Sequence, residues 1–128
     1  MKEIPIMSHK AKTKTILIYG LNPEQRLTLS MLCNQAGITC RILTDGETTM
    51  PISALLSGKE LPKTGAYPIP GKFALLDGFD GQERMAAGLI NQVAPGVIKA
   101  AHTKTHDRWR FCDLCSAILL EHKTMSGM

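Results

Sequence analysis

One pattern of residues occurs twice in this chain, and it restricts the possible folds more than any other feature. A run of apolar residues ends at Gly20, and a second run ends 58 positions later at Gly78. An uninterrupted apolar run indicates a strand that is covered on both faces. Residues typical of a helix start follow each glycine. The sequence therefore predicts one unit, beginning with a strand and a helix, that is present twice.

The first unit is predicted at residues 14–58. After its first strand, Asn22 has the side chain of a helix N-cap, and Pro23 fits the first helical position. A second strand is predicted at residues 38–44, and a short helix follows at residues 51–56. The buried stripe of the longer helix is predicted at three apolar residues with helical spacing: Leu27, Met31 and Leu32.

The second unit is predicted at residues 72–123. A segment rich in proline and glycine, residues 59–71, precludes regular structure and separates the two units. After the strand that ends in the second glycine, Asp80 and Glu83 have the spacing of a capping box. This spacing predicts Asp80 as the N-cap of the second long helix.

The later part of the second unit repeats the first unit less closely. When the units are aligned without a gap, Ile98 falls on Cys40 in the second strand of each unit. A last helix is predicted at residues 107–123, because apolar residues recur there at spacings of three, four and seven. The residues of this expected buried face are Phe111, Leu114, Cys115 and Ile118.

These elements together predict an α/β protein with an internally duplicated β-α-β-α unit. We expect a four-stranded sheet with helices packed on both faces, forming a single domain at residues 14–125 behind a flexible N-terminal arm at residues 1–13. Pseudo-twofold symmetry would make the two central strands antiparallel, and a fully parallel sheet is the alternative. Without helices on both faces, the two units would approach a ferredoxin-like arrangement.

The composition is that of an ordinary folded protein. Of 128 residues, 44% are hydrophobic and 20% are charged, which excludes a disordered chain. The longest apolar runs are too short to span a bilayer, and the N-terminal residues lack the apolar core of a signal peptide. We therefore expect a soluble cytoplasmic protein with no membrane partner, whose four cysteines are reduced.

Several segments resemble one known family. They are the strand at residues 16–20, the segments Tyr67–Pro70 and Leu75–Phe79, and the tryptophan-led segment Trp109–Leu114 ahead of Glu121 and His122. On these segments, from about Thr15 to Met125, the chain is similar to the small bacterial domain of unknown function 3783. Cys112 and Cys115 depart from the aliphatic residues expected there. The resemblance supports the limits of the domain and implies no activity, cofactor or site residue.

The densest group of chemically active side chains lies near the C-terminus. His102, His106, Cys112 and Cys115 have the chemistry of a tetrahedral zinc site, and the two cysteines form a Cys-x-x-Cys pair. A single helix at residues 107–123 opposes this hypothesis, because it assigns Cys115 to the buried face. Packing is the main interpretation of these residues, with a zinc or thiol site as the alternative, and we expect no cofactor otherwise.

The sequence contains no motif of a known catalytic class. Gly20 and Gly78 occupy the place where many α/β proteins bind phosphate, but neither belongs to a glycine-rich phosphate-binding motif. Asp77 invites comparison with receiver domains, yet its counterpart Tyr19 is not acidic. There is no Gly-x-Ser-x-Gly elbow and no spaced carboxylate pair. These observations favour a protein that is not an enzyme.

The net charge of +4 raises the question of nucleic-acid binding. Residues 1–14 carry +3 of that charge, so the remainder of the chain is nearly neutral. Lys104, Arg108 and Arg110 surround Trp109 and form the one basic cluster that indicates weak binding of nucleic acid or another anion. Trp109 is expected instead to pack beneath the last helix.

The sequence therefore predicts a non-catalytic interaction or regulatory module, with a second copy of the chain or another protein as its partner. A zinc or thiol site and weak anion binding are the two alternatives.

Overall fold

The computed structural model describes residues 13–58 and 68–126. All but the last residue of the predicted arm at residues 1–13, and most of the predicted linker at residues 59–71, lie outside these ranges. The described strands are β1 (Thr15–Tyr19), β2 (Thr39–Ile42), β3 (Phe73–Asp77) and β4 (Ile98–Ala101). The described helices are α2 (Pro23–Gln35), α3 (Ile52–Ser57), α4 (Glu83–Val93) and α5 (Phe111–Ser126), with single 3₁₀ turns η1 (Asp45–Glu47) and η2 (Lys104–His106).

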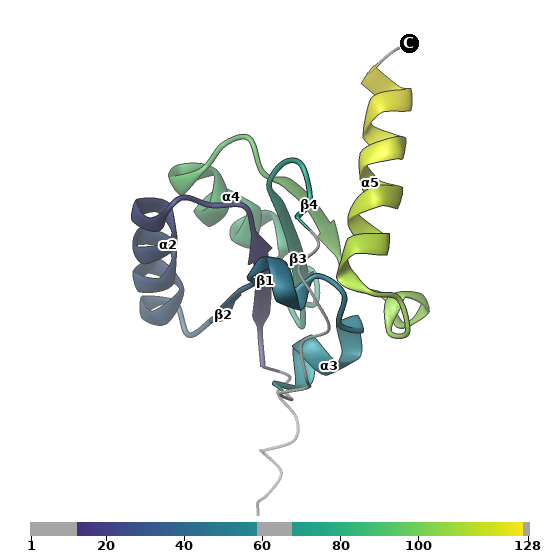
Figure 1. The fold of residues 1–128 in the computed structure, drawn as a ribbon. Coiled ribbons are helices and arrows are strands. Elements are labelled where there is room, and N and C mark those ends of the chain that lie inside the picture. Colours follow the sequence, from purple (N-terminus) through teal and green to yellow (C-terminus); the bar gives the residue numbers. More distant parts are fainter. Residues whose placement is uncertain (1–12, 59–67, 127–128) are drawn as a thin grey trace, which may run out of the picture.

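The strands form one sheet in the order β2-β1-β3-β4. β1 is parallel to β2 and β3 is parallel to β4, whereas the central pair, β1 and β3, is antiparallel. Helices α2 and α4 cover one face of the sheet, and α3 and α5 lie on the other (Figure 1). The predicted α/β fold with helices on both faces is confirmed. Of the two arrangements considered for the central strands, the antiparallel one is present.

The two units are related by pseudo-twofold symmetry about the centre of the sheet. Leu17 in β1 pairs with Leu75 in β3, and these two residues are 58 positions apart. This is the same separation as that of Gly20 and Gly78, so each leucine faces its own counterpart. Both glycines have a positive φ, 98° and 81°, at the end of the first strand of their unit. The repeat predicted from the sequence is therefore present in the backbone.

A second set of reciprocal contacts joins the units beside η1 and η2. Pro51 and Arg110 form an isolated antiparallel bridge. The N–H of Ile52 donates to the carbonyl of Trp109 at 2.9 Å, and the N–H of Phe111 donates to the carbonyl of Met50 at 3.1 Å. Each donor and acceptor has its counterpart 59 positions away. The starts of α3 and α5 are thus held by each other.

The separation of equivalent residues changes from 58 to 59 before β4. The N–H of Ala36 bonds to the carbonyl of Leu32, and the N–H of Ala94 bonds in the same way to Ile90. After this point, however, the register of β4 on β3 places Ile98 where β2 has Thr39. The second unit contains one extra residue in the turn that includes Pro95 and Gly96. The predicted alignment of Ile98 with Cys40 was therefore wrong by one position.

The sheet separates two hydrophobic cores. The core beneath α2 and α4 contains Leu29 and Cys33, whereas Leu27 and Met31 are 65% and 55% exposed. The predicted buried stripe of α2 was therefore wrong at Leu27 and Met31, and Leu32 is half-buried. Both pairs have a spacing of four residues, so spacing alone could not decide which pair faces the sheet. The predicted face of α5 is confirmed, because Phe111, Leu114 and Cys115 are buried and Ile118 packs against them in the second core.

Two helix starts also differ from the prediction. α4 begins at Glu83 with Gln82 as its N-cap, because Asp80 and Gly81 both have a positive φ and belong to the preceding turn. α5 begins at Phe111 because η2 and the bridge at Arg110 occupy the residues before it. None of the described helices is both long and apolar enough to cross a membrane.

Gly20 lies against the backbone of Gly71 and Lys72, just before β3. A Cβ atom at this position would lie 2.5 Å from the carbonyl oxygen of Gly71, and its φ of 98° disfavours any other residue. We expect Gly20→Ala to lower the free energy of unfolding by about 2–4 kcal/mol, from backbone strain and steric overlap. Chemical denaturation followed by circular dichroism measures this change.

Gly88 provides the matched control for this substitution. It lies within α4, its φ is not positive, and no atom lies within 4 Å of the position of an added Cβ. Gly88→Ala should raise the free energy of unfolding by about 0.5–1 kcal/mol, because alanine favours the helix. Equal effects of the two substitutions would contradict the role assigned to Gly20.

Candidate functional site

The four residues predicted to bind zinc have separate environments. His102 follows β4 and faces two aspartates, while His106 in η2 lies 3.2 Å from the hydroxyl of Thr103 and packs edge-on against Trp109. Cys112 and Cys115 are buried in the first turns of α5. Burial, together with the nearby Cys112, raises the pKa of the Cys115 thiol to about 12.

Among the residues that the structure describes, no three His, Cys, Asp or Glu side chains are grouped as metal ligands. Binding zinc through all four predicted residues would require His102 to release its aspartates and both cysteines to leave buried positions. Cys112 and Cys115 are thus neighbours in α5, but the fold does not bring His102 and His106 to them as ligands of one metal. The zinc hypothesis stays a prediction.

His102 instead lies at the centre of a polar cluster that also contains Asp77 and Asp107. Its Nδ1 is 2.9 Å from Oδ1 of Asp77, and its Nε2 is 2.5 Å from Oδ1 of Asp107. The side chains of His102 and Asp77 are only 13% and 17% exposed. The cluster lies beyond the carboxyl ends of β3 and β4, on the side of the sheet that α5 covers.

The same place in the first unit has a different chemistry. Leu43, the counterpart of His102, is buried, and Tyr19, the counterpart of Asp77, donates a hydrogen bond to Asp45 at 2.5 Å. Burial, and then the bond to Asp45, raises the pKa of Tyr19. The second unit therefore holds a histidine between two carboxylates where the first holds a leucine beneath a tyrosine.

The chemistry open to His102 follows from its two contacts. Its two ring nitrogens are its only hydrogen-bonding atoms, and each faces a carboxylate oxygen. Both nitrogens are engaged by Asp77 and Asp107, and a general base needs one nitrogen within reach of a substrate. This arrangement fixes the position of the Thr103–Asp107 turn and favours a structural role.

We expect His102→Leu, which installs the residue of the first unit, to lower the free energy of unfolding by about 1–3 kcal/mol. The substitution removes the ring nitrogens that face two partly buried carboxylates. Thermal and urea denaturation measure the loss. The control is His106→Gln, which should change stability by less than about 0.5 kcal/mol because its bond is exposed. Full stability of His102→Leu would show that the cluster has no structural role.

A second pair of cysteines was not singled out from the sequence. Cys33 in α2 and Cys40 in β2 are free thiols that meet in the core beneath α2, and Cys33 hydrogen-bonds to Cys40. This bond, helped by Ser30, lowers the pKa of Cys40 against the opposing effect of burial. The same bond and burial raise the pKa of Cys33. The signal that could have revealed the pair is the link between α2 and β2, which folds position 33 back over position 40.

The lowered pKa of Cys40 gives it a larger thiolate fraction near neutral pH than the other two shifted thiols, Cys33 and Cys115. We expect iodoacetamide at pH 7.5 to alkylate Cys40 at least about tenfold faster than either of them in the folded protein. Peptide mass spectrometry gives the rates. Cys33→Ala removes the hydrogen-bond donor and should slow the reaction of Cys40. Faster alkylation of Cys115 than of Cys40 would contradict the assignment.

The predicted basic cluster extends from Lys104 in η2 to Arg110, the residue before α5. Lys104 and Arg108 are exposed, whereas Arg110 binds both carboxylate oxygens of Asp113 at 3.0 Å. The bond from Arg110 lowers the pKa of Asp113. Trp109 is 37% exposed, so it does not pack fully beneath the last helix as predicted. Weak anion binding at this cluster stays a prediction.

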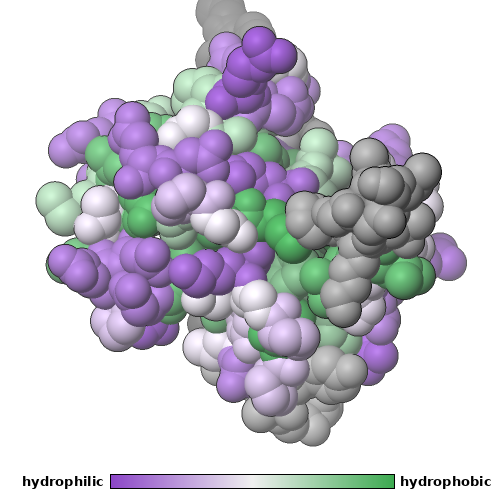
Figure 2. Space-filling view, turned by 90° about the horizontal axis from the view of Figure 1, so that it is seen from above, coloured by the Kyte–Doolittle hydropathy of each residue, from purple (hydrophilic) through white to green (hydrophobic). Residues whose placement is uncertain are grey.

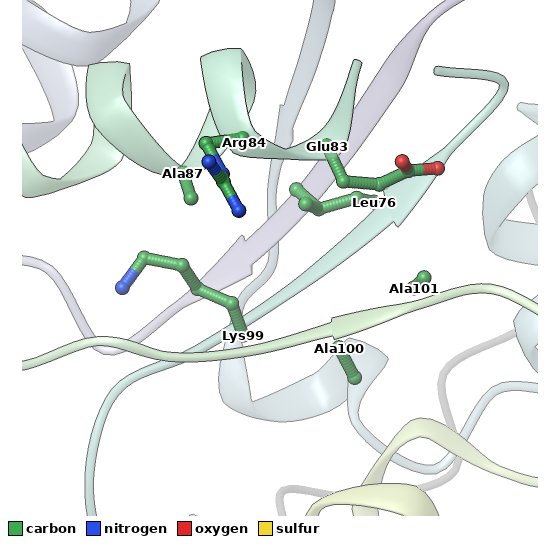
Figure 3. Close-up of a pocket in the computed structure, with 7 residues that line it drawn as sticks. All are labelled: Leu76, Glu83, Arg84, Ala87, Lys99, Ala100 and Ala101. Atoms are coloured by element: carbon green, nitrogen blue, oxygen red, sulfur yellow. The ribbon is translucent and has the colours of Figure 1, made fainter. Parts of the chain in front are cut away.

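The structure also contains an open groove between α4 and β4 that the sequence did not predict. Its volume is about 360 Å³. Arg84 and Lys99 line one end of the groove, with the Lys99 ammonium turned back along β4 to the carbonyl of Val97, and the carboxylate of Glu83 lies at the other end (Figure 3). The residues that line it are Leu76, Glu83, Arg84, Ala87, Lys99, Ala100 and Ala101.

The groove exists because the second unit has small residues where the first unit has large ones. Ala87 is the counterpart of Leu29, which is fully buried beneath α2. Ala101 is the counterpart of Ile42, which packs against the same core. Each replacement removes three carbon atoms from the space between helix and strand. The one-residue shift before β4 also places Lys99 at the position of Cys40, beside this space.

Comparisons with protein families, with curated proteins and with solved structures found no match to the chain. The resemblance to the domain of unknown function 3783 stays a prediction.

Proposed function

We propose that the protein is a non-catalytic binding module that holds a small ligand in the groove between α4 and β4. The observation that carries this proposal is the groove itself, which Ala87 and Ala101 leave open. At the equivalent place in the first unit, Leu29 and Ile42 are part of the core. The two units thus share a backbone and differ in whether this space is filled.

The size and lining of the groove support the proposal. Small-molecule sites have volumes of about 300–1,000 Å³, mostly apolar walls and a few charged groups that orient the ligand. The groove combines about 360 Å³ with apolar side chains from both strands and helix, and with three charged side chains. Leu76 and Ala101, which form the last paired position of β3 and β4, line it at the carboxyl ends of the strands. This is the end at which α/β proteins commonly bind ligands.

The polar cluster supports the non-catalytic part of the proposal. His102 is the residue best suited to acid–base chemistry, and both of its nitrogens face aspartates. It also lies on the opposite side of the sheet from the groove, with the residues that α5 covers.

Binding of a second copy of the chain or of another protein is the second candidate. Leu27 and Met31, one turn apart on α2, are the observation in its favour, because both are largely exposed. Hydrophobic surface is also visible between bands of hydrophilic side chains when the molecule is viewed from above (Figure 2). A cytoplasmic location, with reduced thiols, remains part of the proposal.

Filling the groove tests the principal proposal. We expect hexan-1-ol and hexanoate to shift the amide resonances of Ala87, Lys99 and Ala101 saturably, with millimolar affinity, as is typical of ligands with about eight heavy atoms. Ala87→Leu with Ala101→Ile, which copies the first unit, should abolish these shifts. Two-dimensional NMR of the labelled protein measures binding and shows that each variant is folded.

Ala36→Leu is the control, since it adds a leucine side chain, half of the bulk of the filled variant, at an exposed position at the end of α2. This variant should bind both probes as the natural protein does. Unchanged binding in the filled variant would contradict the location of the site, and the absence of binding to the natural protein would contradict the proposed function.

A further inference from the structure

We infer that the ligand of the groove is a monocarboxylate with a short apolar body, whose carboxylate is bound between Arg84 and Lys99. This inference rests on the proposed function, because it names the class of ligand for the same groove.

Two cationic side chains lie at one end of the groove. Arg84 projects from α4 and Lys99 projects from β4, and both lie over the same end of the groove (Figure 3). These residues come from elements that close the groove on opposite sides. Two like charges at one end of a groove repel each other, and an anion placed between them is attracted to both.

Lys99 and Arg84 both have hydrogen-bond donors that remain available to a ligand. Lys99 donates from Nζ to the carbonyl of Val97 at 2.8 Å, which leaves two of its three donors for a ligand. Within the described ranges, Arg84 has neither a hydrogen bond nor an ion pair to another residue, and its guanidinium has the paired donors that match a carboxylate. The pair therefore has the donors for both oxygens of one carboxylate.

The groove and the pair of cations occur together in the second unit only. Arg84 has a counterpart in Arg26, but the counterpart of Lys99 is Cys40, which packs against the core. The first unit thus has neither the open space nor the second cation. Both features depend on the same local differences, the small side chains and the extra residue before β4.

The other residues that line the groove indicate what the part of the ligand beyond its carboxylate is like. Ala87 lies beside the cations, and Leu76 and Ala101 line the groove toward Glu83, so the space between the charges suits a hydrocarbon body (Figure 3). The carboxylate of Glu83 stands at the far end of the groove (Figure 3). It repels a second negative charge there, so a singly charged anion fits better than a dianion.

A titration with three probes of one length tests the inference. Hexanoate, hexan-1-ol and hexylammonium differ mainly in the charge of the head group, and NMR titration gives the affinity of each. We expect hexanoate to bind about tenfold more tightly than hexan-1-ol, a difference typical of charge-assisted hydrogen bonds. Raising the salt concentration from about 20 to about 200 mM should weaken the binding of hexanoate alone.

Arg84→Gln with Lys99→Gln should reduce the affinity for hexanoate to that for hexan-1-ol and leave hexan-1-ol unchanged. The matched control is Arg26→Gln with Lys72→Gln, which removes the same net charge outside the groove and should leave the preference intact.

The outcomes separate the two proposals. Equal affinity for hexanoate and hexan-1-ol, or a preference for hexylammonium, overturns the carboxylate inference and leaves the groove as a binding site. Binding of none of the three probes overturns the proposed function itself. A preference for hexanoate that survives removal of both cations shows that Arg84 and Lys99 are not its basis, and also overturns the inference.

Discussion

The antiparallel pairing of β1 with β3 is the interaction on which the remainder of the fold depends. Alone, each unit has only two strands, and two strands rarely form a stable sheet in water. Pairing Leu17 with Leu75 joins them into four strands and brings α2 and α4 together on one face. The opposite face then receives α3 and α5, so both hydrophobic cores are built from residues of both units.

The sequence could predict much of this arrangement, because its main signals are local. Apolar runs that end in glycine identified β1 and β3, and the repeat suggested a twofold symmetry with an antiparallel central pair, although a fully parallel sheet remained open. The errors arose where local pattern has two solutions. Leu27 with Met31, and Leu29 with Cys33, have the same spacing in α2, and only packing against the sheet decides between them. The extra residue near Pro95 is visible only through strand register.

The candidate site was far less accessible to sequence analysis, because its residues have no shared motif. Ala87 and Ala101 look like ordinary small core residues, and they mark a groove only when compared with their counterparts in the first unit. His102 was considered as a metal ligand since the sequence contains no sign of its two aspartates. Asp77 is 25 residues earlier, and β3 and β4 must pair before the two side chains meet.

The reciprocal bonds beside Pro51 and Arg110 have an implication for how such a chain can diversify. Each unit completes the backbone bonding of the other, as subunits do in a homodimer with a twofold axis. In a true homodimer every substitution appears on both sides, so a cavity opened in one subunit weakens both cores at once. Joining the subunits in one polypeptide removes that restriction. One half can retain a filled interior that maintains stability, while the other gives up packing to form a cavity.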